Sequence, residues 1–168
     1  MSTFENKVGL VLPGGGARGA YQIGVLKGIS KILPARVSNP FSVISGTSVG
    51  AINASVIASK ADSFIDAVDL LNHIWGNFKT NQVYKTDSPT MFKSSLHWLV
   101  TIVSGGTLVK NPKSLLNNAP LRNLLSDNIN LDNIRSNIDE DNLEAFAITA
   151  AGYSSRKSIT FFQSNKKK

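Results

Sequence analysis

The chain has 168 residues, of which 42% are hydrophobic, and it contains no cysteine. This length and composition predict one domain over residues 1–168, and the lack of cysteine excludes disulfide frameworks, thiolate metal sites and thiol catalysis. The formal charge of +7 favours an anionic partner, but no basic stretch alternates with aromatic residues, so nucleic-acid binding is not expected.

Residues 1–60 alternate between short apolar runs and helical patterns. The continuous apolar run over residues 8–12 stops at a proline and is typical of a buried parallel strand. A helix is predicted over residues 17–33, a second buried strand over residues 41–44, and an alanine-rich helix over residues 49–59. The order strand, helix, strand, helix predicts an open α/β sheet with right-handed crossovers, in which ligands bind at the carboxyl ends of the strands.

Helical segments are expected to follow the second strand. Residues 62–78 carry apolar side chains at helical spacing, with Asp62 as the N-cap, and a further helix is expected over residues 88–103. Short helices are expected to begin at Pro120 and at Asp132 within an asparagine-rich stretch. The chain as a whole shows no internal repeat.

Two strand-like segments, over residues 144–151 and 158–163, predict a hairpin or two neighbouring strands near the end of the chain. No apolar stretch reaches the roughly 18–20 residues that cross a bilayer, and the first apolar run is too short for a signal peptide. The protein is therefore expected to be cytoplasmic or bound peripherally to a membrane, with an anionic membrane surface as a candidate partner.

A glycine-rich loop, Pro13-Gly14-Gly15-Gly16-Ala17-Arg18-Gly19, follows the first predicted strand. Gly14, Gly16 and Gly19 match the dinucleotide fingerprint, but the acidic residue expected about 20 residues later is absent, since residues 6–61 contain no Asp or Glu. Consecutive glycines let backbone amides point at an anion without obstruction by side chains, so an oxyanion loop that includes Gly15 is favoured over a cofactor site. Arg18 either braces this loop or meets a substrate phosphate.

Gly46-Thr47-Ser48-Val49-Gly50 fits the pattern G-x-S-x-G between a predicted strand and a predicted helix. In this pattern the serine occupies a sharp turn, and the two glycines relieve crowding around it. Ser48 is therefore the candidate nucleophile, and the amide of Val49 is expected to donate to an oxyanion. Serine needs a base at neutral pH, but His73 and His97 both fall within predicted helices, where a packed or surface role is favoured.

The two glycine motifs resemble those of the patatin-like phospholipases, and they match the bacterial branch of that family nearly residue for residue. The resemblance implies a three-layer α/β/α sandwich with a mainly parallel sheet, and hydrolysis of the acyl esters of lipids or phospholipids without a metal or other cofactor. It also implies that Ser48 is the nucleophile of a Ser-Asp dyad, and that the loop from Gly14 to Gly19 forms the oxyanion hole.

The resemblance also implies a dyad aspartate in an Asp-Gly segment, and this chain contains no Asp-Gly. Asp62 follows a helix of about 11 residues that begins beside Ser48, so Asp62 is expected to lie roughly 15 Å or more from Ser48. Asp87, in a predicted loop, is the least implausible substitute for the dyad aspartate. Our hypothesis is a patatin domain that is incomplete at the C-terminus and has an unpaired sheet edge. The alternative is a catalytically inactive fragment that acts as a lipid- or partner-binding module.

Overall fold

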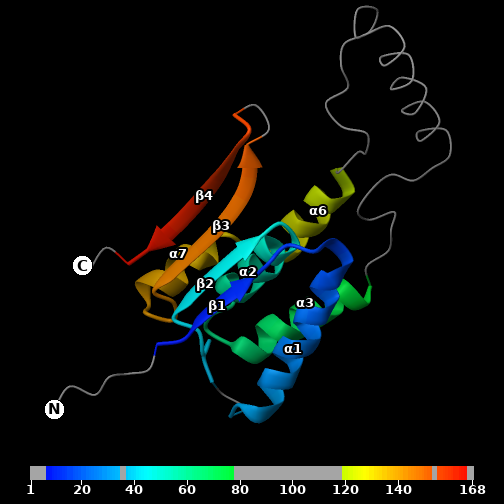
Figure 1. The fold of residues 1–168 in the computed structure, drawn as a ribbon. Coiled ribbons are helices and arrows are strands. Elements are labelled where there is room, and N and C mark those ends of the chain that lie inside the picture. Colours follow the sequence, from blue (N-terminus) through cyan, green and yellow to red (C-terminus); the bar gives the residue numbers. More distant parts are fainter. Residues whose placement is uncertain (1–6, 35–36, 78–118, 153–154, 166–168) are drawn as a thin grey trace, which may run out of the picture. The chain divides into compact units, whose positions relative to one another are not determined.

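The computed structural model describes residues 7–34, 37–77, 119–152 and 155–165 (Figure 1). The chain divides into two compact units, one formed by Met1–Gly76 with Ile129–Lys168 and the other by Asn77–Asn128. Within the second unit, the described secondary structure is helix α6 (Ala119–Asn128), which includes the predicted start at Pro120. A single domain over residues 1–168 stays a prediction.

The first unit contains a sheet and the helices that pack against it. Its elements in chain order are β1 (Gly9–Leu12), the short 3-10 helix η1 (Gly16–Arg18), α1 (Gly19–Ile32), β2 (Val43–Thr47), α2 (Val49–Ser59), α3 (Phe64–Gly76), α7 (Asp132–Asp139), β3 (Ala145–Gly152) and β4 (Lys157–Ser164). This order confirms the predicted alternation of strands and helices, and the closing pair of strands forms a hairpin.

The strands form one mixed sheet in the order β1-β2-β3-β4 (Figure 1). β1, β2 and β3 are parallel, with Leu12 opposite Gly46 and Gly46 opposite Ile148, whereas β4 runs antiparallel to β3. α2 packs against the three parallel strands, and α1, α3 and α7 pack against α2. The carboxyl ends of the parallel strands meet at one edge, which is where such sheets bind ligands.

α2 is the central helix of the first unit. It contacts the three parallel strands and also α1, α3 and α7. Nine of its 11 residues are buried, and Val56 and Ile57 have no exposed surface, as expected for a helix that is apolar on all sides. The buried residues Val49 and Gly50 thus fix the start of α2 against its neighbours, and with it the residue that precedes the helix.

The two faces of the sheet differ in burial. Ile44 and Phe146, which are paired on one face, are 0% and 6% exposed. Val11 and Val43 project from the other face and are 75% and 40% exposed. The described elements of the first unit thus supply the sheet and one helical layer of an α/β sandwich.

Two details of the sequence-based prediction are wrong. The second strand covers Val43–Thr47 and not residues 41–44, because Ser45 and Gly46 pair with both neighbouring strands although they lack large apolar side chains. The start of α3 is capped by Ser63 in place of Asp62, since Ser63 Oγ accepts a hydrogen bond from the amide of Asp66 at 3.4 Å. The helix expected over residues 88–103 lies outside the described residues.

β4 is the last strand in the sheet order, and all of its residues are exposed. Phe161 and Phe162 are 58% and 74% exposed. In the part of the chain that the structure describes, no strand pairs with the outer edge of β4. Among the described helices, none has the length and apolar character that crossing a bilayer requires.

Candidate active site

Ser48 is the single residue between β2 and α2. Its backbone has φ 56° and ψ −125°, a conformation that residues with a side chain rarely adopt because the Cβ atom is crowded by the backbone. The side chain is exposed and lies at the N-terminus of α2. Backbone strain of this kind is typical of functional sites, and here it occurs at the serine that the G-x-S-x-G pattern indicates.

Gly46 and Gly50 lie where backbone segments approach each other closely. A Cβ atom on Gly46 would be 2.3 Å from the carbonyl oxygen of Gly50, and one on Gly50 would be 2.0 Å from the carbonyl oxygen of Leu12 in β1. Both distances are far shorter than the roughly 3.5–4.0 Å at which non-bonded carbon atoms attract each other. The obstacles are backbone atoms, so a larger residue at either position would displace the turn that carries Ser48.

The glycine loop after β1 lies beside Ser48. A Cβ atom on Gly14 would be 3.2 Å from Ser48 Cβ and 3.9 Å from Ser48 Oγ, so the two residues are direct neighbours. Within the described ranges, the amides of Gly14 and Gly15 donate to no backbone carbonyl, whereas the carbonyl of Gly15 accepts the amide of Arg18 at 3.1 Å. Gly14, whose amide has no backbone acceptor, is therefore a direct neighbour of Ser48.

Arg18 and Gly19 lie where the loop enters α1. Arg18 is exposed, and its side chain lies along the backbone of Gly15, where a Cβ atom would be 3.3 Å from Arg18 Cβ. Gly19 is buried, and a Cβ atom there would be 2.7 Å from the ring of Trp75 and 2.6 Å from the side chain of Val49. Arg18 thus packs against the loop at Gly15, and Gly19 makes room for Trp75.

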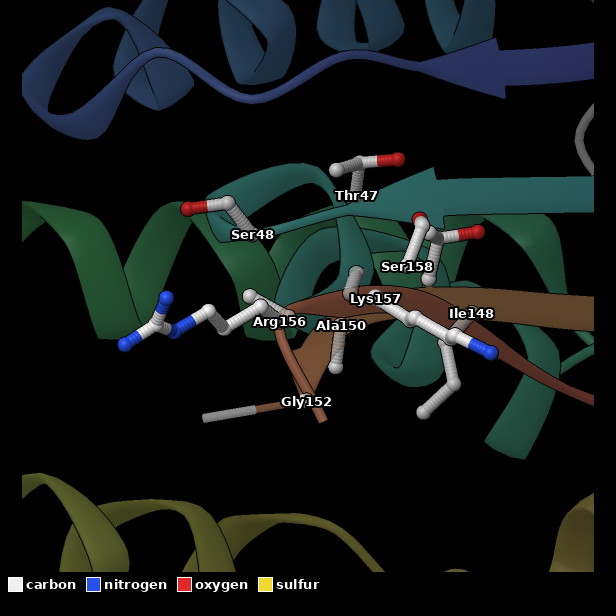
Figure 2. Close-up of a pocket in the computed structure, with 11 residues that line it drawn as sticks. Thr47, Ser48, Ile148, Ala150, Gly152, Arg156, Lys157 and Ser158 are labelled. Atoms are coloured by element: carbon white, nitrogen blue, oxygen red, sulfur yellow. The ribbon is translucent and has the colours of Figure 1, made fainter. Parts of the chain in front are cut away.

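An open pocket of about 710 Å³ lies at the carboxyl ends of β2 and β3, with Ser48 in its wall. Ala51, Ile148 and Ala150 add apolar surface, and the turn between β3 and β4 adds Arg156. Figure 2 shows the side chains of Ser48 and Arg156 extending to the same side, while Lys157 extends to the other. The volume lies within the roughly 300–1,000 Å³ that is usual for small-molecule sites.

The described residues that line this pocket include no carboxylate and no imidazole. His73 is exposed on α3, which does not contribute to the pocket wall, and His97 and Asp87 lie outside the described residues. Asp62 lines a separate polar pocket of about 190 Å³ beyond the C-terminal end of α2, far from Ser48, as the length of the helix predicted. Across the described ranges, no cluster of His, Cys, Asp and Glu side chains is suited to a metal ion.

The residues of the β3–β4 hairpin that line the Ser48 pocket form no recognisable sequence motif. Arg156 and Lys157 stand in a final stretch without acidic residues, which indicates an anionic partner but not its position. They reach the Ser48 pocket because β3 pairs with β2, with Thr149 opposite Thr47, and because β4 returns along β3. Pairing between residues so far apart in the chain is a tertiary property, which a local pattern does not reveal.

Short stretches of the chain are similar to curated phospholipases. Lysophospholipase nte1 of Aspergillus terreus is 47% identical over 55 residues, which are 33% of this chain and 3% of the relative. The cUMP-AMP-activated phospholipase of Escherichia coli is 49% identical over 49 residues, which are 29% of this chain and 15% of the relative. The matches therefore span only a small part of the length of these relatives. No solved structure matches the chain.

A family match covers far more of the chain than these pairwise similarities. The sequence pattern of the patatin-like phospholipases matches residues 10–166, a range that contains the glycine loop, the turn at Ser48 and the β3–β4 hairpin. The mainly parallel sheet with helices packed against it agrees with the fold of that family. The chain therefore belongs to the patatin-like phospholipase family.

Proposed function

We propose that the protein is a serine acyl hydrolase that cleaves acyl esters of phospholipids, with Ser48 as the nucleophile. Membership of the patatin-like phospholipase family supports lipid hydrolysis, and the relatives carry the names lysophospholipase and phospholipase. The observation that carries the proposal is the strained turn at Ser48 directly beside the glycine loop. A serine held in this way is exposed to substrate while its backbone neighbours remain available as hydrogen-bond donors.

The proposed reaction begins with attack of Ser48 Oγ on the ester carbonyl carbon, which opens the C=O bond to a tetrahedral oxyanion. Amides of Gly14, Gly15 and Gly16 lie in the loop beside Ser48, and Val49 is the first residue of α2, whose amide lacks an intrahelical acceptor. These amides form the proposed oxyanion hole. Collapse of the oxyanion expels the alcohol and leaves the acyl group on Ser48, from which water removes it.

An aspartate outside the described residues is the proposed base, as the second member of a Ser-Asp dyad. The described residues of the pocket wall include no carboxylate and no imidazole that could accept the Ser48 proton. The positive end of the α2 dipole favours negative charge at Ser48, and the stabilisation near a helix terminus is about 0.3–1 kcal/mol at exposed positions. That amount assists a base but does not replace one.

Covalent labelling with a fluorophosphonate tests the nucleophile directly. The serine oxygen forms a bond to phosphorus and fluoride leaves, which gives a stable analogue of the tetrahedral intermediate. We expect an adduct on the peptide that contains Ser48, located by tandem mass spectrometry, and no adduct in Ser48→Ala or in heat-denatured protein. An adduct on another serine, or none in the native protein, would contradict the proposed role of Ser48.

Arg156 is proposed to contact the phosphate of the substrate, since its side chain extends to the same side of the pocket as Ser48. Arg156→Gln should lower kcat/KM for a phospholipid roughly fivefold relative to kcat/KM for p-nitrophenyl butyrate, because an exposed ion pair contributes at most about 1 kcal/mol. Lys157→Gln is the matched control, since that side chain extends to the other side. Equal ratios in both variants would count against a phosphate contact at Arg156.

A binding module without activity is the second candidate function, and it is favoured by the described pocket wall, which lacks a base. Such a module would hold a lipid in the same pocket and contact an anionic membrane through the net charge of +7. Equal hydrolysis of p-nitrophenyl butyrate by the wild type and Ser48→Ala, together with binding to vesicles of anionic phospholipid, would support it. Activity that Ser48→Ala removes would exclude it.

A further inference from the structure

Asn53 is a fully buried polar residue in the core-facing helix α2, with 0% exposure. A buried amide is costly unless both its oxygen and its nitrogen are hydrogen bonded. Asn53 Oδ1 accepts a hydrogen bond from Trp75 Nε1 of α3 at 3.0 Å. Asn53 Nδ2 donates to Gln22 Oε1 of α1 at 2.8 Å and also approaches the carbonyl of Gly19 at 3.4 Å. One side chain therefore links three helices.

The same series of hydrogen bonds continues into the glycine loop. Gln22 Nε2 donates to the carbonyl oxygen of Pro13 at 2.8 Å. Pro13 is the first residue after β1 and immediately precedes Gly14. Three consecutive hydrogen bonds thus connect Trp75 to the start of the loop that lies beside Ser48.

The direction of each hydrogen bond is determined by the two ends of the series. The indole of Trp75 can only donate, and the carbonyl of Pro13 can only accept. Asn53 must therefore present its oxygen to Trp75 and its nitrogen to Gln22, and Gln22 must present its nitrogen to Pro13. Reversing either amide would place two donors or two acceptors against each other, so the series has a single satisfied arrangement.

The last hydrogen bond acts on the peptide group between Pro13 and Gly14. In a planar trans peptide the carbonyl oxygen and the amide hydrogen point in opposite directions, so holding the oxygen of Pro13 also orients the amide of Gly14. A Cβ atom on Gly14 would be only 3.9 Å from Ser48 Oγ. The orientation of this peptide group therefore bears directly on the backbone donors beside the nucleophile.

We infer that Trp75, Asn53 and Gln22 are positioning residues that hold the loop of residues 13–16 in the orientation needed for the oxyanion hole. This inference rests on the proposed function. None of the three residues lines the pocket, so they act through the loop and do not touch the substrate. Gly19 supports the arrangement, because its missing side chain lets the Trp75 ring reach the site where α1, α2 and α3 meet.

Gln22→Met tests the inference, because methionine has a similar length and helix propensity but makes neither hydrogen bond. Asn137→Ala is the matched control. Asn137 is another buried asparagine, 4% exposed, and its Nδ2 donates to the carbonyl of Ala58 near the opposite end of α2 from Ser48. Both variants lose a buried or partly buried amide, but only Gln22→Met breaks the link to the loop.

Two measurements are made on the full chain. For phosphonylation of Ser48 by a fluorophosphonate, Gln22→Met should lower the maximal rate roughly tenfold and leave the affinity for the probe unchanged. The expected loss is smaller than the roughly 10²–10³-fold loss that follows removal of an oxyanion donor, because the donor is still present but less well oriented. NMR order parameters of the Gly14, Gly15 and Gly16 amides should fall towards about 0.6 from the roughly 0.85 of rigid backbone. Asn137→Ala should change neither quantity, even where its melting temperature falls further.

Wild-type labelling rates and loop order parameters in Gln22→Met would overturn the inference, as would equal changes in Asn137→Ala. Asn53→Leu, which removes the middle of the series, must reproduce the effect of Gln22→Met. If the wild type does not react with the probe, the proposed function fails and the order parameters alone decide the positioning role. Failure of the proposed function and failure of this inference are therefore distinguishable.

Discussion

Replacement of Ser48 by alanine is expected to lower the hydrolysis of p-nitrophenyl butyrate by roughly 10³- to 10⁶-fold, to the residual level that the oxyanion hole alone supports. Alanine has no oxygen that can attack the carbonyl carbon, so the covalent intermediate does not form and only the oxyanion hole remains. The measurement is kcat at saturating ester, corrected for spontaneous hydrolysis in buffer.

The loss must be separated from unfolding. The Ser48 side chain is exposed, and alanine has the same Cβ atom in the same strained backbone, so the change in the free energy of unfolding should stay within about 0.5 kcal/mol. Ser45→Ala is the matched control, because it removes a hydroxyl from β2, the strand that leads into the Ser48 turn, without touching the pocket. Full activity in Ser48→Ala would refute the nucleophile, and lost activity in Ser45→Ala would point to a structural cause.

Replacement of Gly50 by alanine is expected to destabilise the first unit by at least about 3 kcal/mol, because the added methyl group meets backbone that has no room to yield. The new Cβ atom would lie 2.0 Å from the oxygen and 2.5 Å from the carbon of the Leu12 carbonyl. Relief of this clash requires α2 to move away from β1, which also moves Ser48. For a chain of this size, 3 kcal/mol corresponds to a fall in melting temperature of roughly 6–12 °C.

Gly28→Ala is the control, a glycine-to-alanine substitution that is expected to raise the stability of the protein. Gly28 lies inside α1, and a Cβ atom there has no neighbour within 4 Å. Alanine at this position should stabilise the helix by about 0.5–1 kcal/mol, since glycine is a poor helix former. Thermal unfolding followed by circular dichroism checks both variants. A melting temperature for Gly50→Ala equal to that of the wild type would show that the close approach to Leu12 is not a constraint.

Much of the fold could be predicted because the responsible patterns are local. The apolar run that forms β1 and the small apolar residues of α2 contain their own secondary-structure signal, and the bounds predicted for α2 agree with those of the structure. β2 was placed too early, because its last residues are small or polar and are held by pairing with β1 and β3. Pairing of this kind overrides intrinsic strand preference.

The resemblance to the family, the nucleophile candidate and the glycine loop can be predicted from the amino-acid sequence, because each depends on consecutive residues. A turn at Ser48, for example, needs small neighbours within two positions on either side. The fold is needed to see that Gly14 lies beside Ser48, that Arg156 lines the pocket, and that Gln22 and Asn53 connect Trp75 to the loop. These contacts join separate elements. They depend on strand order and helix packing, which no local pattern encodes.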